Sequence, residues 1–339
     1  MHANFSFHWV NEPFEDSVLY AQQQNAKDDI LFDLGDLNRF SPALMMRVKW
    51  VCISHTHLDH FVGFPRFLRA NLKVSGREIH FFGPEGFIRN MEGALAAYTW
   101  NLLDYYDIKF FVTEIREKRL IRAQFHSKTK FKRKILSRCR RKSHVIVENE
   151  IFKLEADLLD HHTPVVGYRL CEKDRFAVNK DALLANGYQS GPWLAVLKEK
   201  LLNKEPQDSP VTTNLGVKTL GELSEKLILN KKFPSYAYLT DFGYRPQNVI
   251  TALELARGVD KLFIESNFLD HDRHNAEETQ HLTALQAGMF AEEAGAKEVR
   301  LFHFSQRYLE GRKCEAEIFY REMETGREIM RKQLQGVQK

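Results

Sequence analysis

The sequence predicts an α/β domain in which helices pack on layered β-sheet. Short apolar runs typical of strands alternate with helical patterns, and the centre of the chain is rich in strand-like segments. This alternation is typical of sheets covered by helices. A length of 339 residues with 43% hydrophobic composition is enough for one large core.

The first third of the chain contains the clearest elements. Strand-like apolar runs occupy 30–36, 48–54 and 79–83. The segment 61–72 repeats apolar residues at helical spacing, which predicts a short helix. Pro84 and Gly86 predict a turn that leads into a second helix reaching about residue 103.

Similar signals return after a polar middle section. The segment 145–161 is typical of two paired strands, and single strands are expected at 236–241, 261–266 and 299–305. Helical patterns fill 193–202, 246–257 and 276–295. No shift in composition marks a boundary, so we expect a single domain over 1–339. Two stretches resemble insertions on it, a basic one at 116–142 and an arm-like one at 180–232.

The basic segment 116–142 holds 13 of the 49 Lys and Arg residues and one acid, Glu117. The rest of the chain has 36 basic and 44 acidic residues, a net charge of −8. A basic segment on an acidic body predicts a docking site for a polyanion, and a solvated charged insertion is the alternative. A membrane-surface role is a third alternative, which the sparse apolar residues of this segment favour less. The candidate docking residues are Lys132, Arg133, Lys134, Arg140 and Arg141.

Targeting and redox signals favour a cytoplasmic protein that does not enter a membrane. The chain has no run of about 18 apolar residues, and its N-terminus lacks the basic and apolar regions of a signal peptide. Its four cysteines are widely spaced and form no CxxC pair, which favours reduced thiols.

The stretch 52-CISHTHLDHFVGF-64 carries the strongest chemical signal. It places His55, His57, Asp59 and His60 within six residues, directly after an expected strand. Residues two apart in extended backbone point the same way, so His55 and His57 can converge on one ion. Imidazole nitrogens with a carboxylate suit Zn²⁺, and less specifically Mn²⁺ or Fe²⁺.

Further ligands are expected where other strands end, because loops at strand ends carry function. Three residues meet this condition: His161, Asp241 and His303. An aspartate can bridge two metals with its two oxygens, which suits Asp241. Each of the three taken alone is better explained as a capped turn or a satisfied core histidine. The combination with the 55–60 cluster predicts a site for two metal ions.

These motifs resemble a known family. H-T-H-L-D-H at 55–60 is similar to the HxHxDH signature of metallo-β-lactamase-fold hydrolases, which implies a four-layer αββα sandwich with a dinuclear site at one edge. Within that superfamily the chain resembles ribonuclease Z, the tRNA 3′-processing endoribonuclease family. Four further stretches are similar to motifs of that family: 161–170, 239–243, 280–288 and 303–308.

The resemblance implies roles for the individual ligands. His55, His57 and His161 would hold one zinc, Asp59, His60 and His303 would hold the other, and Asp241 would bridge them. The neighbouring His162 leaves the choice between His161 and His162 open.

The resemblance also implies the catalytic residues. Asp59 would orient the attacking water or accept its proton. His281 would assist the leaving oxygen, and Glu265 would orient His281. Arg307 matches a position that contacts substrate phosphate, where a planar guanidinium can bind two oxygens. Structural alternatives exist for Glu265, as a strand-end carboxylate, and for Arg307, as a salt bridge.

Other parts of the chain depart from the family pattern. The family opens with a Gly-Thr turn that is absent here, and 31-LFDLGDLNRF-40 replaces the usual Asp-Cys-Gly-Glu-Gly stretch. Gly191 and Pro192 stand where the tRNA-binding arm of the family carries a Gly-Pro-rich tip. The basic segment 116–142 has no obvious counterpart and could supplement that arm.

Three functions are compatible with these observations. The resemblance implies a zinc endoribonuclease that processes tRNA 3′ ends, with RNA as its partner and a homodimer as in many relatives. The first alternative is a hydrolase of the same fold for a small-molecule phosphodiester, cyclic nucleotide, lactone or thioester, because fold does not determine substrate. The second is a non-enzymatic RNA-binding or scaffold protein that kept the fold. A degraded ligand set would indicate it, and no ligand is missing.

Overall fold

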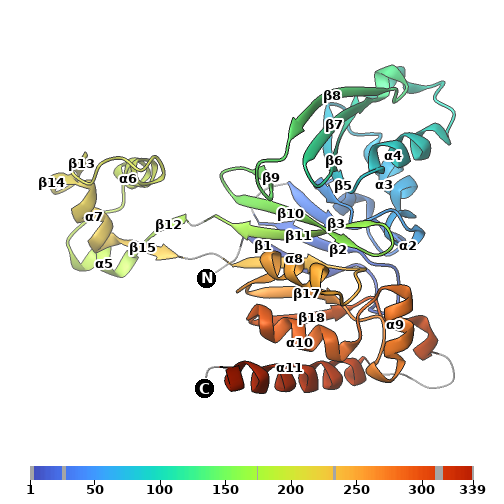
Figure 1. Ribbon diagram of the computed structural model, residues 1–339. Coiled ribbons are helices and arrows are strands. Elements are labelled where there is room, and N and C mark those ends of the chain that lie inside the picture. The colour runs from blue at the N-terminus through green and yellow to red at the C-terminus, as the bar shows by residue number, and fades with distance from the viewer. Residues whose placement is uncertain (1–3, 25–27, 174, 232–233, 310–315, 338–339) are drawn as a thin grey trace. The chain divides into compact units, whose positions relative to one another are not determined.

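The computed structural model describes residues 4–24, 28–173, 175–231, 234–309 and 316–337 (Figure 1). The chain divides into two compact units. The main unit comprises 1–171 and 234–339, and a smaller unit comprises 172–233. The smaller unit contains the segment 180–232 expected as an arm-like insertion.

The first sheet of the main unit has eight strands in sequence order, from β1 to β8. The inner strands β3 to β6 run parallel, and the strands at both edges pair antiparallel. The strands are β1 (Phe5–Trp9), β2 (Leu19–Gln23), β3 (Asp29–Phe32), β4 (Val48–Cys52), β5 (Arg77–Gly83), β6 (Ile108–Ile115), β7 (Arg119–His126) and β8 (Arg133–Arg140).

The second sheet has six strands in the order β18-β17-β16-β11-β10-β9. Strands β16, β17 and β18 run parallel, and β11 pairs antiparallel with β16. The strands are β9 (Val145–Glu148), β10 (Phe152–Asp160), β11 (Pro164–Glu172), β16 (Ser235–Leu239), β17 (Lys261–Glu265) and β18 (Glu298–Phe302).

The two sheets pack face to face, and helices cover their outer faces. Phe32 of the first sheet lies 5.3 Å from Tyr238 of the second, measured between ring centroids. The alternation of β5 shows the layering: Phe82 joins the core between the sheets, whereas Phe81 joins the core beneath the helices. The predicted αββα sandwich is therefore confirmed.

Two groups of helices form the outer layers (Figure 1). The first sheet is covered by α1 (Pro42–Met45), α3 (Phe64–Asn71) and α4 (Phe87–Ala96), with the short α2 (Leu58–Phe61) before α3. The second sheet is covered by α8 (Pro246–Ala256), α10 (Ala284–Ala294) and α11 (Glu317–Val337), with α9 (Arg273–Thr279) before α10. Four short 3₁₀ helices lie at Leu103–Tyr105, Ser127–Thr129, Asp270–Asp272 and Gln306–Leu309.

Two predicted helices differ in the structure. The helix expected from Pro84 to about residue 103 ends at Ala96. The helix expected over 276–295 is broken into α9 and α10. Gln280 adopts a left-handed conformation, with φ 60°, and Thr283 begins α10 with a reciprocal capping box to Gln286. The break leaves His281 outside both helices.

The basic segment 116–142 forms part of the first sheet. It supplies β7 and β8, and β8 is the edge strand. Phe125 and Ala123 of β7 are buried in the core beneath the helices. This segment is therefore built into the sandwich, whereas the sequence suggested an insertion on it.

The smaller unit has its own apolar cluster, which includes Trp193, Leu197 and Leu223. Its two small sheets pair β12 with β15 and β13 with β14. Its elements are β12 (Arg175–Val178), α5 (Lys180–Ala185), α6 (Trp193–Leu202), β13 (Pro210–Thr213), β14 (Gly216–Thr219), α7 (Leu220–Leu227) and β15 (Ile228–Lys231). Among the described residues of the whole chain, no helix has the length and apolar character needed to cross a membrane.

Replacement of Gly326 by alanine should destabilise the protein, because α11 lies against α10 there. A Cβ atom on Gly326 would lie 2.1 Å from the backbone oxygen of Leu285, which cannot rotate away. We expect a loss of roughly 1–3 kcal/mol in the free energy of unfolding, measured by urea denaturation. The control is Gly93→Ala in the exposed face of α4, where nothing lies within 4 Å of a Cβ. It should be neutral or stabilising by up to about 1 kcal/mol. Equal stability of both variants would contradict the close helix contact.

Candidate metal centre

The centre is built at strand ends that meet at one edge of the sandwich. His55 and His57 follow β4, His57 has an extended backbone, and the ring centroids of the two histidines lie 4.3 Å apart. His161 follows β10, Asp241 follows β16 and His303 follows β18. Residues that are far apart in the sequence are thus brought together, as the strand-end argument predicted.

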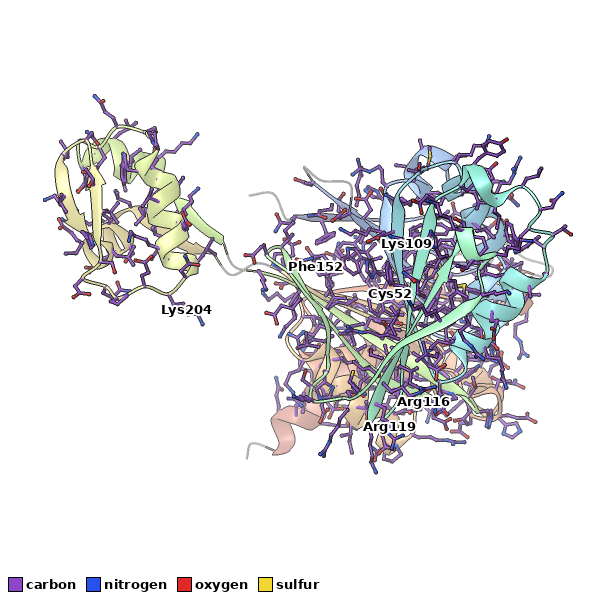
Figure 2. All side chains as sticks on the ribbon, turned by 90° about the horizontal axis from the view of Figure 1, so that it is seen from above. Cys52, Lys109, Arg116, Arg119, Phe152 and Lys204 are labelled. Carbon is purple, nitrogen blue, oxygen red and sulfur yellow. The ribbon has the colours of Figure 1, made fainter. Side chains whose placement is uncertain are left out.

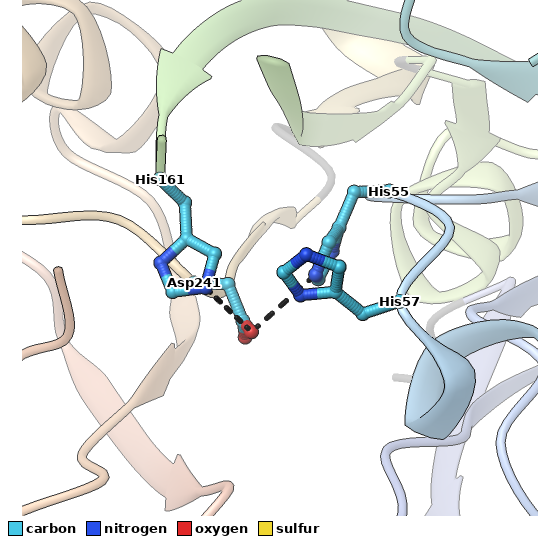
Figure 3. A group of neighbouring side chains, drawn as sticks. All are labelled: His55, His57, His161 and Asp241. Atoms are coloured by element: carbon cyan, nitrogen blue, oxygen red, sulfur yellow. Dashed lines mark ion pairs between the residues drawn. The ribbon is translucent and has the colours of Figure 1, made fainter. Parts of the chain in front are cut away.

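One group of ligand atoms comes from His55, His57, His161 and Asp241 (Figure 3). One ligand atom from each residue, an imidazole nitrogen or a carboxylate oxygen, lies within 4.8 Å of the ligand atoms of the other three. The Asp241 Oδ2 atom is 3.6 Å from His55 Nε2 and 3.9 Å from His161 Nε2. Three imidazoles and a carboxylate around one point are a suitable donor set for a transition-metal ion.

A second group consists of Asp59, His60 and His303. His303 Nε2 is 3.2 Å from Asp59 Oδ2, and His60 Nε2 is 3.3 Å from the same oxygen. His60 Nε2 is also 3.4 Å from Asp241 Oδ2, and His303 Nδ1 is 3.4 Å from Asp241 Oδ1. The Asp241 carboxylate therefore contacts residues of both groups.

The protonation states in the first group fit metal binding. Burial lowers the pKa of His55 to about 2, so its imidazole is neutral. The Nε2 atoms of His55 and His60 are buried without a hydrogen-bond partner among the described residues. A buried polar atom without a partner is costly, and a bound cation would satisfy both nitrogens. These unpartnered nitrogens, together with the nearby carboxylates, therefore fit a site for a bound metal ion.

The histidines of the second group hold their protons more tightly than His55 does. Burial lowers the pKa of His303, but Asp241 and Asp59 raise it to about 10. Burial raises the pKa of Asp59, but His303 and His60 bring it below its usual value. A metal ion that binds His303 must therefore displace a proton, and its affinity should rise with pH.

Asp33 holds the histidines of both groups in orientation, and the sequence analysis did not assign it this role. This fully buried residue accepts hydrogen bonds from Ser54 N at 2.6 Å, Ser54 Oγ at 2.8 Å and Tyr238 OH at 2.8 Å. Its Oδ2 atom is also 2.8 Å from His60 Nδ1. Because the Ser54 hydroxyl donates to Asp33, it accepts from His55 Nδ1 at 3.0 Å. Both imidazoles thus carry their hydrogen on Nδ1 and present Nε2 to the centre.

The structure distinguishes His161 from His162. His161 is buried, and its Nδ1 donates to the backbone oxygen of Gln280 at 2.8 Å, which leaves Nε2 facing Asp241. His162 is exposed, adopts φ 55°, and its Nε2 lies 3.3 Å from the Glu278 backbone oxygen. The geometry therefore favours His161 as the ligand.

His281 and Glu265 form a buried pair beside the centre. His281 Nδ1 is 2.9 Å from Glu265 Oε2, and Glu265 Oε1 accepts from Phe242 N at 2.9 Å. The ring of His281 lies 4.6 Å from that of His161, between centroids. Burial lowers the pKa of His281, but Glu265 raises it above its usual value. The imidazole is thus kept in a form that can donate a proton.

The residues predicted to contact a substrate phosphate or a nucleic acid do not form one cluster. Arg307 lies 4.9 Å from the ring centroid of Phe268 and 3.8 Å from Asp272, and its side chain is 45% exposed. Arg141 is engaged within the sandwich, where it binds Asp157 at 2.9 Å and the Ala156 backbone oxygen.

The other predicted docking residues occupy three places. Arg133 pairs with Glu92 at 3.3 Å. Lys132, Lys134 and Arg140 are exposed on or next to β8. Gly191 and Pro192 precede α6 in the smaller unit.

Comparisons with known proteins agree with this geometry. No family model matches the chain. Ribonuclease Z of Deinococcus radiodurans is 27% identical over 305 residues, which cover 89% of this chain and 90% of that protein. Ribonuclease Z of Anoxybacillus flavithermus is 29% identical over 291 residues, with 84% and 79% covered. The chain therefore resembles ribonuclease Z over most of its length, as the motifs predicted.

Solved structures show the same fold at lower identity. The short form of human tRNase Z superposes with a TM-score of 0.51 and 18% identity, covering 90% of this chain and 94% of that one. A metallo-β-lactamase-fold protein of Bacillus subtilis gives a TM-score of 0.51 and 14% identity, with 95% and 89% covered. This fold together with the two ligand groups fits a metal-binding protein.

Single replacements of His161 and His162 should show which of the two adjacent histidines binds the metal ion. His161→Ala should lower the bound metal by about one ion per chain, because it removes a buried donor. His162→Ala should retain the wild-type metal content, because its side chain lies outside the group. Plasma mass spectrometry of the metal-loaded proteins measures both, and the reverse result would transfer the ligand role to His162.

Replacement of Asp33 by asparagine should weaken metal binding although Asp33 lies outside both ligand groups. An amide nitrogen cannot accept the hydrogen bonds that orient His60 and Ser54. We expect a loss of roughly 10–100-fold in affinity, measured by competition with a chelator. The exposed Asp36→Asn is the matched control and should bind like wild type. If the Asp33 variant bound metal with unchanged affinity, Asp33 would not be needed to orient the histidines.

Proposed function

We propose that this chain is a metal-dependent endoribonuclease that cuts precursor tRNA at the 3′ side. The observation that carries the proposal is the buried Asp241 carboxylate, which contacts residues of two separate ligand groups beside the His281–Glu265 pair. Two-metal centres of this kind are suited to phosphodiester cleavage. The extended similarity to proteins named ribonuclease Z supports tRNA as the substrate.

The ligand assignment follows the two groups. We propose that His55, His57 and His161 hold one ion and that Asp59, His60 and His303 hold the other, with Asp241 shared. Zinc suits these nitrogen and carboxylate donors, and manganese or ferrous iron would also be accepted. Bound ions would lower the pKa of a water molecule and counter the charge of the substrate phosphate.

Side chains of the protein would orient the attacking water, donate a proton to the leaving oxygen and contact the substrate phosphate. The Asp59 side chain is 42% exposed, and its low pKa keeps it ionised, so it can accept a hydrogen bond from the attacking water and orient it. As the bond from phosphorus to the 3′ oxygen breaks, His281 can give that oxygen a proton. Glu265 holds the imidazole in orientation and stabilises its charged form. Arg307 is the proposed contact to substrate phosphate.

Incubation of metal-loaded protein with a precursor tRNA bearing a 3′ trailer tests the substrate. A single cut after the discriminator base is expected, and Asp59→Ala should reduce its rate by roughly 10²–10⁴-fold. Asp36→Ala, an exposed acid near the same loop, is the control and should cut normally. Intact precursor together with hydrolysis of a chromogenic phosphodiester would instead support the small-molecule alternative.

Three finer features belong to the same proposal. The bound metal is zinc, the protein acts in the cytoplasm on RNA, and two copies form a homodimer. Sedimentation equilibrium of the purified protein tests the last of these, since a mass of one chain at micromolar concentration would contradict it.

Replacement of Glu265 by glutamine should move the pH–rate profile. Glu265 raises the pKa of His281, so the general acid stays protonated to higher pH in the wild type. Without the carboxylate that pKa falls, and the alkaline limb of kcat should shift to lower pH. At alkaline pH the loss should approach the contribution of a general acid, roughly 10²–10⁴-fold. Glu277→Gln, an exposed acid of α9, is the control. An unshifted limb with a uniform loss would mean that Glu265 has only a structural role.

A further inference from the structure

An arginine-lined pocket lies at the edge of the first sheet. It has a volume of about 450 Å³ and opens between the start of α4 and strands β6 to β8, of which β8 is the edge strand. Its charged lining residues are Glu85, Arg89, Glu114, Arg116, Arg133 and Arg138. The volume falls within the range of ligand pockets, roughly 300–1,000 Å³.

The positive charge of the pocket exceeds what its carboxylates neutralise. Arg116 alone engages both glutamates, with 2.8 Å to Glu85 and 2.6 Å to Glu114. It lies at the turn between β6 and β7, next to Arg119 (Figure 2). Among the described residues, the exposed guanidinium groups of Arg89 and Arg138 have no hydrogen-bond or ion-pair partner. Two guanidinium groups are thus available to an anion.

A β-bulge places these arginines on one face. In the pairing of β7 with β8, Phe125 faces Arg133 and Ile121 faces Arg138, with a register shift between them. Cross-strand partners share a face, so Arg133 and Arg138 lie on the face covered by α4. They are five positions apart in the sequence, and strict alternation would have put them on opposite faces. Leu136 is the extra residue that corrects the alternation.

The helix α4, which lines the pocket, also contacts the loop that carries His55 and His57. Asn90 Nδ2 of α4 donates to Thr56 Oγ1 at 2.6 Å, and Thr56 stands between His55 and His57. Arg89, which lines the pocket, is the residue before Asn90. One turn of α4 therefore connects the pocket to the metal centre.

We propose that this pocket binds a phosphate of the RNA strand next to the bond that is cut. The inference rests on the proposed function, because it assigns a contact to that substrate. A guanidinium group can bind two oxygens of one phosphate at the same time. No aromatic side chain lines the pocket, so the lining offers no surface on which a base could stack. The contact is accordingly to the backbone and independent of sequence.

A different role for these charges is protection of the sheet edge. Lysine and arginine on an edge strand prevent pairing with a second molecule, and such a role does not depend on the face that they occupy. The opposite face of the same hairpin offers a matched comparison. Arg122 and Lys134 are exposed there, and their cross-strand partners Ser137 and Gln124 share that face. Lys134, a predicted docking residue, thus lies outside the pocket.

Equilibrium binding to a fluorescent precursor tRNA with a 3′ trailer tests the proposal. All proteins carry Asp59→Ala so that the RNA stays intact, and thermal melting checks their folding. R89A/R138A should bind about 10–100-fold more weakly in 0.1 M salt, and its slope of log affinity against log salt should fall by roughly 1 to 2. R69A/R122A, which removes the same charge at one exposed arginine of that other face and one of α3, should bind within about threefold of the parent.

The outcomes separate the explanations. Loss confined to R89A/R138A supports the pocket, and partial recovery in R89K/R138K would show that paired guanidinium contacts contribute beyond charge. Equal loss in both double variants, or loss in neither, overturns it in favour of a diffuse field or of edge protection. Because binding is measured without cleavage, failure of the wild type to cut tRNA remains a separate result.

Discussion

The site depends on one buried negative charge. The Asp241 carboxylate is almost wholly removed from water and sits within 4 Å of four imidazole rings. A buried carboxylate is costly unless cations or hydrogen-bond donors surround it. Here the surrounding histidines stabilise the buried charge, because their imidazole nitrogens lie close to the Asp241 carboxylate. The residue also adopts φ 48°, a strained conformation for a side chain with a Cβ, which the surrounding packing must hold in place.

The sheet topology explains why the ligands converge. In the first sheet, parallel β3 and β4 end together, and they deliver Asp33 and His55. In the second sheet, parallel β16, β17 and β18 end together and deliver Asp241, Glu265 and His303. The two sheets face each other, so both sets of strand ends reach one edge of the sandwich (Figure 1). The two candidate ligand groups, the aspartate that orients their histidines and the carboxylate that contacts His281 are therefore consequences of one arrangement of strands.

The sequence contained much of this site because the 55–60 cluster is dense and its remaining members lie directly after apolar runs. Asp33 was missed for a physical reason: an aspartate after a strand usually caps a turn, and only the tertiary structure brings Tyr238 and His60 to it. The break at Gln280 was missed because helical periodicity continues on both sides of it. Strands β7 and β8 were not predicted because their high charge is typical of an exposed insertion. A strand at or next to the edge of a sheet can carry arginine on both faces, whereas a central strand cannot.

The most direct measurement of the central claim is anomalous diffraction from crystals of the wild-type protein loaded with zinc. Two peaks are predicted, one among His55, His57 and His161 and one among Asp59, His60 and His303, with Asp241 within bonding distance of both. A single peak, or zinc bound away from Asp241, would contradict a dinuclear centre organised by this carboxylate.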